Sequence, residues 1–135
     1  MRVIAGIHGG RRLQTPAGLD TQPTSDRVRE ALFSILGDRV QDARVLDLFA
    51  GSGALAIEAL SRGAREATLV DNAAPAIRAI TANLEALEAD ATVVRAEARR
   101  FLGGASRSGR SYDLVFLDPP YRLAASLGSD LSAAL

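Results

Sequence analysis

The feature that most limits the fold of this chain is a regular alternation, from Ala43 onward, of short apolar runs with helix-like segments. Four apolar runs have the length and composition of buried strands, and they cover residues 44–49, 66–70, 91–95 and 112–117. Helical patterns lie between them at residues 54–61, 75–89 and, as a single turn before a polar loop at 103–111, at 99–102. Short strands that alternate with helices imply right-handed βαβ units and a parallel sheet, so the expected fold class is α/β and Rossmann-like.

The first 42 residues follow a different pattern, and we expect them to form an N-terminal part beside an α/β core in residues 43–135. Short apolar pieces among turn residues predict a small β-hairpin within residues 1–22. A helix should follow, because Thr24, Ser25 and Asp26 are good N-caps and Gly37 is a good stop. Its apolar stripe is predicted at the positions with helical spacing, which are Val28, Leu32, Ile35 and Leu36.

Composition excludes several classes of protein. The 135 residues include 16 basic and 16 acidic residues and no cysteine. The cancelling charges argue against a protein that coats a polyanion, and the missing thiols remove disulfides, thiolate zinc sites and cysteine nucleophiles. No apolar run approaches the ~20 residues of a membrane-spanning helix, and the N-terminus lacks the pattern of a signal peptide. We therefore expect a cytoplasmic protein with no membrane partner.

A glycine-rich turn follows the first core strand. Gly51-Ser52-Gly53 opens a helix whose N-terminal amides can face a ligand, and glycine lets the backbone come close to that ligand. Asp71 lies about twenty residues further on, where a carboxylate that binds ribose hydroxyls is expected, although it could also cap the next helix. This spacing fits both nicotinamide dinucleotides and S-adenosylmethionine.

Two further aspartates add chemistry. Asp47 lies inside a buried strand, where a carboxylate is costly unless it is hydrogen-bonded or faces a cation. S-adenosylmethionine would supply that cation, but bonds to loop amides would explain Asp47 equally well. The segment Asp118-Pro119-Pro120-Tyr121 is rigid and extended, so that its carboxylate and a proline carbonyl can accept hydrogen bonds from an exocyclic amine while the tyrosine stacks on a base. All these residues follow parallel strands and are expected to share one site at the carboxyl ends.

Residues 45–53 (VLDLFAGSG) together with the Asp-Pro-Pro-Tyr segment resemble class I S-adenosylmethionine-dependent methyltransferases that act on an amino group of a nucleobase. Residues 2–6 (RVIAG) and 23–33 (PTSDRVREALF) resemble the N-terminal signature of the bacterial RsmD family, whose members methylate guanine N2 in the 16S rRNA of the small ribosomal subunit. The resemblance spans nearly the whole chain. It implies S-adenosylmethionine as cofactor, S-adenosylhomocysteine as product and the assembled small subunit as partner.

The resemblance also implies a role for each motif residue, and it requires no metal ion. Cofactor contacts would come from Asp47, Phe49, Ala50, Gly51, Ser52, Gly53, Asp71, Asn72, Glu97 and Ala98. Glu97 is a mild departure, since the family often has Asp or Asn there. The acceptor guanine would be held by the catalytic segment Asp118, Pro119, Pro120 and Tyr121. RNA would be contacted by Arg11, Arg12, Arg27 and Arg29. For His8 we expect only a surface or packing role.

The class I sheet has more strands than the four core strands found here, so we expect the later strands to be missing after Leu135. The complete protein is expected to be a monomer, whereas a protein ending at Leu135 would need a partner over the open sheet edge. Three other functions stay open. They are methyl transfer to another amine such as adenine N6 or a protein glutamine, a nicotinamide-dependent oxidoreductase, and a non-catalytic RNA-binding remnant.

Overall fold

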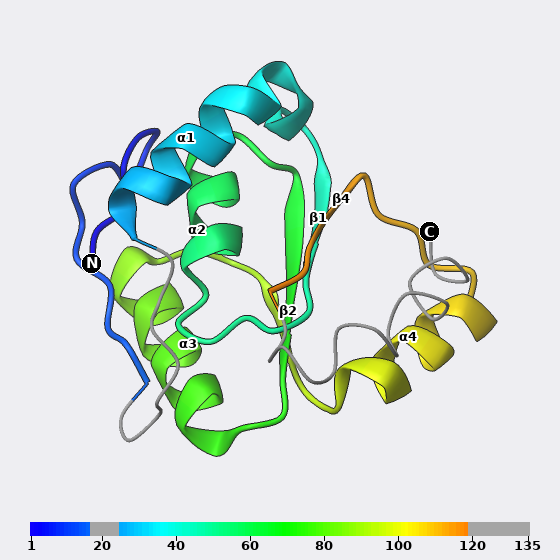
Figure 1. Cartoon of the computed structure of the whole chain (residues 1–135). Coiled ribbons are helices and arrows are strands. Elements are labelled where there is room, and N and C mark those ends of the chain that lie inside the picture. Colours follow the sequence, from blue (N-terminus) through cyan, green and yellow to red (C-terminus); the bar gives the residue numbers. More distant parts are fainter. Residues whose placement is uncertain (17–24, 119–135) are drawn as a thin grey trace.

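The structure, a computed structural model, describes residues 1–16 and 25–118 (Figure 1). The centre of this part is a sheet of four parallel strands in the order β3-β2-β1-β4. The strands are β1 (Arg44–Asp47), β2 (Glu66–Asp71), β3 (Thr92–Arg95) and β4 (Leu114–Phe116). In the register of the sheet, Val45 lies opposite Ala67 of β2 and opposite Leu114 of β4. The predicted α/β class with a parallel sheet is confirmed.

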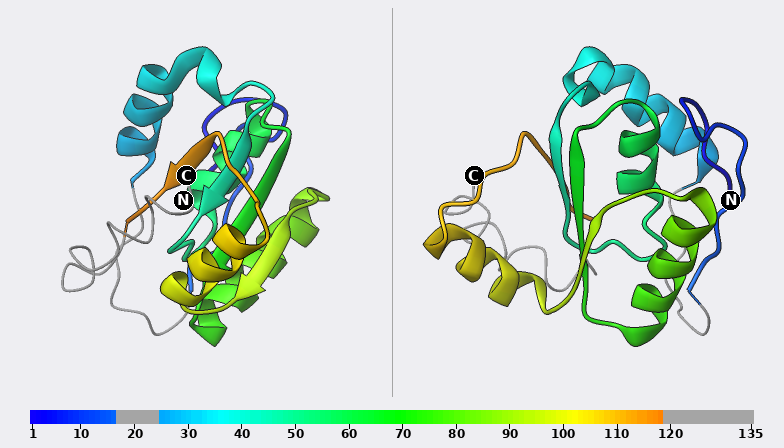
Figure 2. Two further views of the ribbon diagram at one scale, coloured as in Figure 1. Left: turned by 90° about the vertical axis from the view of Figure 1, so that its right-hand side faces the viewer. Right: turned by 180° about the vertical axis from the view of Figure 1, so that it is seen from behind.

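Helices cover both faces of the sheet (Figures 1 and 2). They are α1 (Asp26–Leu36), the 3-10 helix η1 (Gly37–Val40), α2 (Ala54–Ser61), α3 (Ala74–Leu87) and α4 (Ala98–Arg107). The first three α-helices lie on one face and α4 lies on the other. Alternate residues of a strand point to opposite faces, so Val45 packs with Phe33 and Ile57, whereas Leu46 packs with the α4 side chains. No helix in the described ranges is long and apolar enough to cross a membrane.

Helix α1 begins and ends near its predicted limits but buries a different face. The Ser25 hydroxyl accepts a hydrogen bond from the Val28 amide at 3.2 Å, and Gly37 closes the helix with a φ of 54°. The predicted stripe is wrong at two positions, because Val28 and Ile35 are 54% and 78% exposed. The residues that the helix buries are Arg29 and Phe33. The cause is that a charged side chain enters the interior, which an apolar pattern cannot anticipate.

The predicted hairpin is confirmed within residues 1–13, and the part of its predicted range from residue 17 to 22 lies outside the described residues. Arg2 and Arg12 form an antiparallel bridge, and the Val3 amide donates to the Arg11 carbonyl at 2.9 Å. The hairpin packs tightly on the end of α2. Gly6 has a φ of +83°, and a Cβ at this residue would lie 1.9 Å from the carbonyl oxygen of Ser61. Glycine is therefore required here by both conformation and space.

Helix α4 corrects a second expectation. The sequence predicts one helical turn followed by a polar loop from residue 103, but the helix continues to Arg107 through two glycines. Its buried residues, Ala98, Phe101, Leu102 and Ala105, recur at helical spacing and cover the second face of the sheet. Burial of this face outweighs the poor helix propensity of glycine. The predicted helical tail after residue 124 lies outside the described residues.

Candidate active site

The polar residues that follow the strands meet at one edge of the sheet. The glycine turn joins β1 to α2, Asp71 ends β2, Glu97 precedes α4 and Asp118 follows β4. Because the four strands are parallel, all of these residues lie at their carboxyl ends (Figure 1). Asp118 is exposed and is the last residue of its described range. Its neighbours Pro119, Pro120 and Tyr121 lie outside the described residues.

The two glycines of the turn have different reasons to be glycine. Gly53 has a φ of +83°, and a Cβ there would lie 2.9 Å from Cδ2 of Leu69 in the core. Gly51 has a φ of +59°, but a Cβ there would meet no atom of the described residues within 4 Å. Packing on the sheet therefore excludes a side chain at Gly53. At Gly51 the backbone faces open space, which a ligand could approach closely.

Asp71 holds the turn in place. One carboxylate oxygen accepts a hydrogen bond from the Gly51 amide at 3.0 Å, and the other accepts one from the Ala73 amide at 2.9 Å. Each carboxylate oxygen can accept a second bond, so the half-buried side chain can still bind a pair of hydroxyls. Ala73 is the N-cap residue of α3. Asp71 lies two residues before it and is therefore not the N-cap of this helix.

Asp47 is only 3% exposed, and its pKa is raised to about 7. Burial is the largest cause, and the negative charges of Asp71 and Asp118 raise the pKa further, while a hydrogen bond from the backbone of Ala56 opposes the shift. Three carboxyl groups thus lie at or just after the carboxyl ends of the neighbouring strands β2, β1 and β4. Such a group of acids repels a further anion and attracts a cation.

Asn83 is a functional candidate that the sequence analysis missed. Its buried side-chain amide donates to the Ser52 carbonyl at 2.9 Å and to the Gln14 carbonyl at 3.0 Å, and its oxygen accepts from the Gln14 amide at 2.7 Å. One side chain therefore joins α3, the glycine turn and the segment after the hairpin. The signal in the sequence is an asparagine among the core positions Ile80, Leu84 and Leu87 of a helix.

Glu58 is a second residue that the sequence analysis missed, and it explains why Arg29 is buried. The fully buried Glu58 carboxylate accepts hydrogen bonds from the backbone amides of Ile4 and Ala5 at 2.7 and 3.1 Å. It also pairs with the guanidinium groups of Arg29 at 3.1 Å and Arg62 at 2.8 Å. Arg29 further pairs with Asp26. The expectation that Arg29 contacts RNA is therefore wrong for this structure, because the side chain is 0% exposed and ion-paired.

The other predicted arginines are exposed. Arg12 and Arg27 lie on the surface, and the Arg11 guanidinium donates to the Ala86 carbonyl at 2.8 Å. Glu97 is exposed as the N-cap residue of α4, and Asn72 is exposed beside Asp71. The remaining predicted cofactor residues range from half-buried to buried, and they are Phe49, Ala50, Ser52 and Ala98. His8 is half-buried, and its backbone amide donates to the Ser61 hydroxyl at 2.9 Å.

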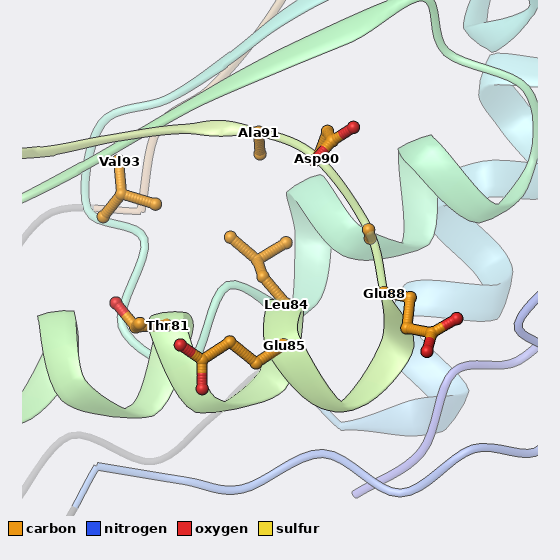
Figure 3. Close-up of a pocket in the computed structure, with 8 residues that line it drawn as sticks. Thr81, Leu84, Glu85, Glu88, Asp90, Ala91 and Val93 are labelled. Carbon is orange, nitrogen blue, oxygen red and sulfur yellow. The ribbon is translucent and has the colours of Figure 1, made fainter.

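A hollow of about 480 Å³ lies elsewhere, between α3 and the edge strand β3 (Figure 3). Leu84 and Val93 contribute apolar surface, and Glu85, Glu88 and Asp90 lie around it. Asp90 precedes β3, so the hollow extends to the amino end of this strand, away from the glycine turn. It is therefore not part of the site described above. Within residues 1–16 and 25–118, no group of His, Cys, Asp or Glu side chains has the arrangement of a metal site.

Comparison with known proteins connects this geometry to a family. The sequence matches the family model described as "Conserved hypothetical protein 95" over residues 1–133. It is 45% identical over 124 residues to the putative rRNA methyltransferase YlbH of Bacillus subtilis, covering 90% of this chain and 67% of that protein. The chain belongs to the RsmD family. It is also 44% identical over 123 residues to the ribosomal RNA small subunit methyltransferase D of Escherichia coli K12, covering 90% of this chain and 61% of that protein. This RsmD-family chain thus spans about two thirds of the length of these curated relatives.

Solved structures agree with this family membership. A hypothetical protein of Thermus thermophilus matches with a TM-score of 0.89 and 37% identity, over 100% of this chain and 79% of that one. The putative methyltransferase yhhF of Escherichia coli matches with a TM-score of 0.79 and 45% identity, over 89% and 64% of the two chains. A more distant match, with a TM-score of 0.65 and 28% identity over 76% and 28% of the two chains, is the putative methyltransferase SMU.776, which was solved in complex with SAH.

Proposed function

We propose that this RsmD-family protein transfers a methyl group from S-adenosylmethionine to the N2 amine of a guanine in 16S rRNA. The observation that carries the proposal is the meeting of the Gly51 turn, Asp47, Asp71 and Asp118 at one edge of the sheet. A cationic donor and an amine acceptor both suit an edge rich in carboxyl groups. The names of the curated relatives support the choice of ribosomal RNA as substrate.

The residues on the donor side fit an S-adenosyl cofactor. The open space beside Gly51 leaves room for the ligand, and the free acceptor positions of Asp71 suit the two ribose hydroxyls. The buried Asp47 carboxyl offers negative charge, once ionised, to the sulfonium and ammonium groups. Glu97, with Ala98 behind it, would border the adenine. When bound, the cofactor supplies an electrophilic methyl group.

On the acceptor side, the Asp118 carboxylate and the Pro119 carbonyl would accept hydrogen bonds from the two N–H groups of the guanine amine. Tyr121 would stack on the base. These contacts orient the nitrogen lone pair toward the methyl carbon and stabilise the positive charge that develops on nitrogen. The nitrogen–carbon bond forms as the carbon–sulfur bond breaks, and one amine proton then leaves to Asp118 or to water. The base must leave its stack to enter the pocket, which costs a few kcal/mol.

We assign the two parts of the chain different tasks. Residues 43–135 would bind the cofactor and the acceptor base, and residues 1–42 would contact RNA through the exposed Arg11, Arg12 and Arg27. The partner would be the assembled small ribosomal subunit in the cytoplasm, and no metal ion would take part.

The test is methyl transfer from labelled cofactor to small subunits that lack the modification, followed by mapping of the labelled nucleotide. We expect label on one guanine N2 with the wild-type protein and at least a roughly 100-fold lower rate with Asp118→Ala. Asp113→Ala is the matched control, since it removes an exposed carboxylate just before β4, at the opposite end of the same strand. Equal rates for the wild type and Asp118→Ala would remove the catalytic assignment.

The same assay separates the alternative functions. Label on an adenine or a protein side chain would favour methyl transfer to another amine. Calorimetry distinguishes the oxidoreductase, because S-adenosylhomocysteine should bind and NADH should not. The SAH complex of the related SMU.776 favours the methyltransferase of these two.

A further inference from the structure

The charges of this chain are distributed unevenly. Over the whole sequence 16 basic and 16 acidic residues cancel, yet residues 95–110 contain five arginines and only one acid, Glu97. The segment therefore carries a net charge of +4, and it runs from the end of β3 through α4 to three residues beyond that helix. The function proposed above gives these arginines no role. So dense a local positive charge is typical of a surface that binds a polyanion.

Helix α4 presents part of this charge on its outer side. Its buried face packs on the sheet through Phe101, Leu102 and their neighbours at helical spacing. Arg100 and Arg107 are separated by about two turns, so that both lie on the side of the helix opposite Leu102. Both are exposed. The Arg107 guanidinium extends back over Gly103, with Nη1 3.5 Å from the position that a Cβ of Gly103 would occupy.

Gly103 and Gly104 lie between these two arginines in the interior of the helix. Neither has the positive φ that requires glycine, and a Cβ at Gly104 would meet no atom of the described residues within 4 Å. Glycine is a poor helix former, so both residues lower the stability of α4. Packing against the described residues does not require Gly104. Gly104 is half-buried and lies about one helical turn from both Arg100 and Arg107, so the helix surface between these arginines carries no side chain at this residue.

We propose that the outer side of α4, formed by Arg100, Gly103, Gly104 and Arg107, binds the phosphate backbone of RNA. This inference rests on the proposed function, because the RNA that delivers a guanine to the carboxyl edge would continue along α4. The helix starts near that edge, after its N-cap residue Glu97, and extends outward on the side of the sheet opposite α2 and α3 (Figure 1). The planar guanidinium group of arginine can donate two hydrogen bonds to the oxygens of one phosphate. Glycine allows a sugar-phosphate chain to approach the helix backbone closely. The contact would lie across the sheet from the N-terminal hairpin (Figure 2).

The first test measures the salt dependence of RNA binding. A labelled RNA stem-loop is titrated with the wild-type protein, with the double variant Arg100→Gln/Arg107→Gln and with the control Arg39→Gln/Arg65→Gln. The control removes the same charge from exposed arginines outside α4. We expect the slope of log K against log salt to fall in magnitude by about 1.5 for the α4 variant, and less for the control. Equal slopes for the two double variants would overturn the proposal.

The second test uses Gly104→Ala, which should move stability and binding in opposite directions. The added methyl group has room in the free protein, so the thermal midpoint should rise as helix propensity improves. RNA binding should weaken several-fold, because the methyl group blocks the approach of the RNA backbone. A higher midpoint with unchanged RNA affinity would contradict the role of the glycines.

Two further measurements distinguish RNA from an acidic protein partner and separate this inference from the proposed function. Displacement of the RNA by a poly-glutamate peptide with equal affinity would overturn the inference in favour of an acidic protein partner. Methyl transfer is measured on the same samples. Transfer by the wild type with no effect of the α4 variant on RNA binding would overturn this inference alone. An α4-dependent salt slope without any methyl transfer would instead support the RNA surface and overturn the proposed function.

Discussion

At the scale of single residues, Asp47 shows how the site uses an unfavourable group. A buried carboxyl next to Asp71 and Asp118 has a pKa of about 7, so that it is largely protonated at mildly acidic pH. A cation in the site would favour its ionised form. With the cofactor bound as proposed above, the protonation state of Asp47 would couple the stability of the protein to cofactor binding.

We predict opposite pH dependences for stability and for cofactor affinity. Since the pKa of Asp47 is raised from 3.8 to about 7 in the folded state, its stabilising contribution is complete below pH ~4 and is lost as the pH rises through 7. S-adenosylmethionine should bind about tenfold more tightly at pH 8 than at pH 6, because the ionised fraction of a group with this pKa rises about tenfold. Asp47→Asn should remove both trends, as measured by denaturant unfolding and by calorimetry. A variant that keeps the wild-type pH dependence would show that another group is responsible.

At the scale of elements, the buried carboxylate of α2 connects three segments of the chain. Glu58 binds the amides of the N-terminal hairpin, Arg29 of α1 and Arg62 at the end of its own helix. The Arg29 Nε atom has no hydrogen-bond partner among the described residues, so this guanidinium depends on its other contacts. Such a network specifies one arrangement of the segments because each partner is costly to leave unpaired.

We predict that Glu58→Ala destabilises the protein by about 3–5 kcal/mol, since it removes the buried carboxylate partner of Arg29 and leaves only the half-exposed Asp26 as an ion-pair partner. The double variant Glu58→Leu/Arg29→Met should lose less stability than the sum of the losses in Glu58→Leu and Arg29→Met, because it removes both charges together. Asp113→Ala breaks the exposed pair with Arg44 and serves as the control with a much smaller effect. Urea unfolding of these variants measures the differences, and strict additivity would argue against a coupled network.

The elements also show what could be predicted from the sequence. The strands, the glycine turn and Asp71 follow from apolar runs and fixed spacing, and the structure has them at one edge. The face of α1 could not be predicted, because the partner of Arg29 is a glutamate 29 residues away. Asn83 was missed for the same reason, since its partners are backbone atoms of distant segments. The length of α4 depends on burial against the sheet, which outweighs the local signal of two glycines.

At the scale of the whole molecule, one aromatic contact joins the N-terminal helix to the last described strand. The rings of Phe33 and Phe116 have centroids 5.7 Å apart, and the Arg62 guanidinium lies 5.0 Å from the Phe33 ring centroid. Phe33 is 2% exposed and belongs to the larger of the two apolar clusters. The N-terminal part and the α/β core therefore share one interior.

We predict that the two parts unfold in a single transition and that Phe33→Ala destabilises both by about 3–5 kcal/mol. Hydrogen exchange at the Ile4 and Val45 amides reports the two parts separately, and the variant should accelerate both equally. Ile35→Ala on the exposed side of the same helix should have little effect, since Ile35 is 78% exposed. Faster exchange at Ile4 alone would show that the hairpin and α1 unfold independently.

The pairing of β1 with β4 has a consequence for synthesis of the protein on the ribosome. Val45 lies opposite Leu114, far along the chain, whereas its partner in β2 is Ala67. The glycine turn and Asp71 thus leave the exit tunnel well before Asp118, and elements close in sequence can assemble first. The half of the pocket proposed to bind the methyl donor would therefore form on the growing chain ahead of the half proposed to accept the base. With the function proposed above, transfer to RNA would have to wait for the later insertion of β4 beside β1.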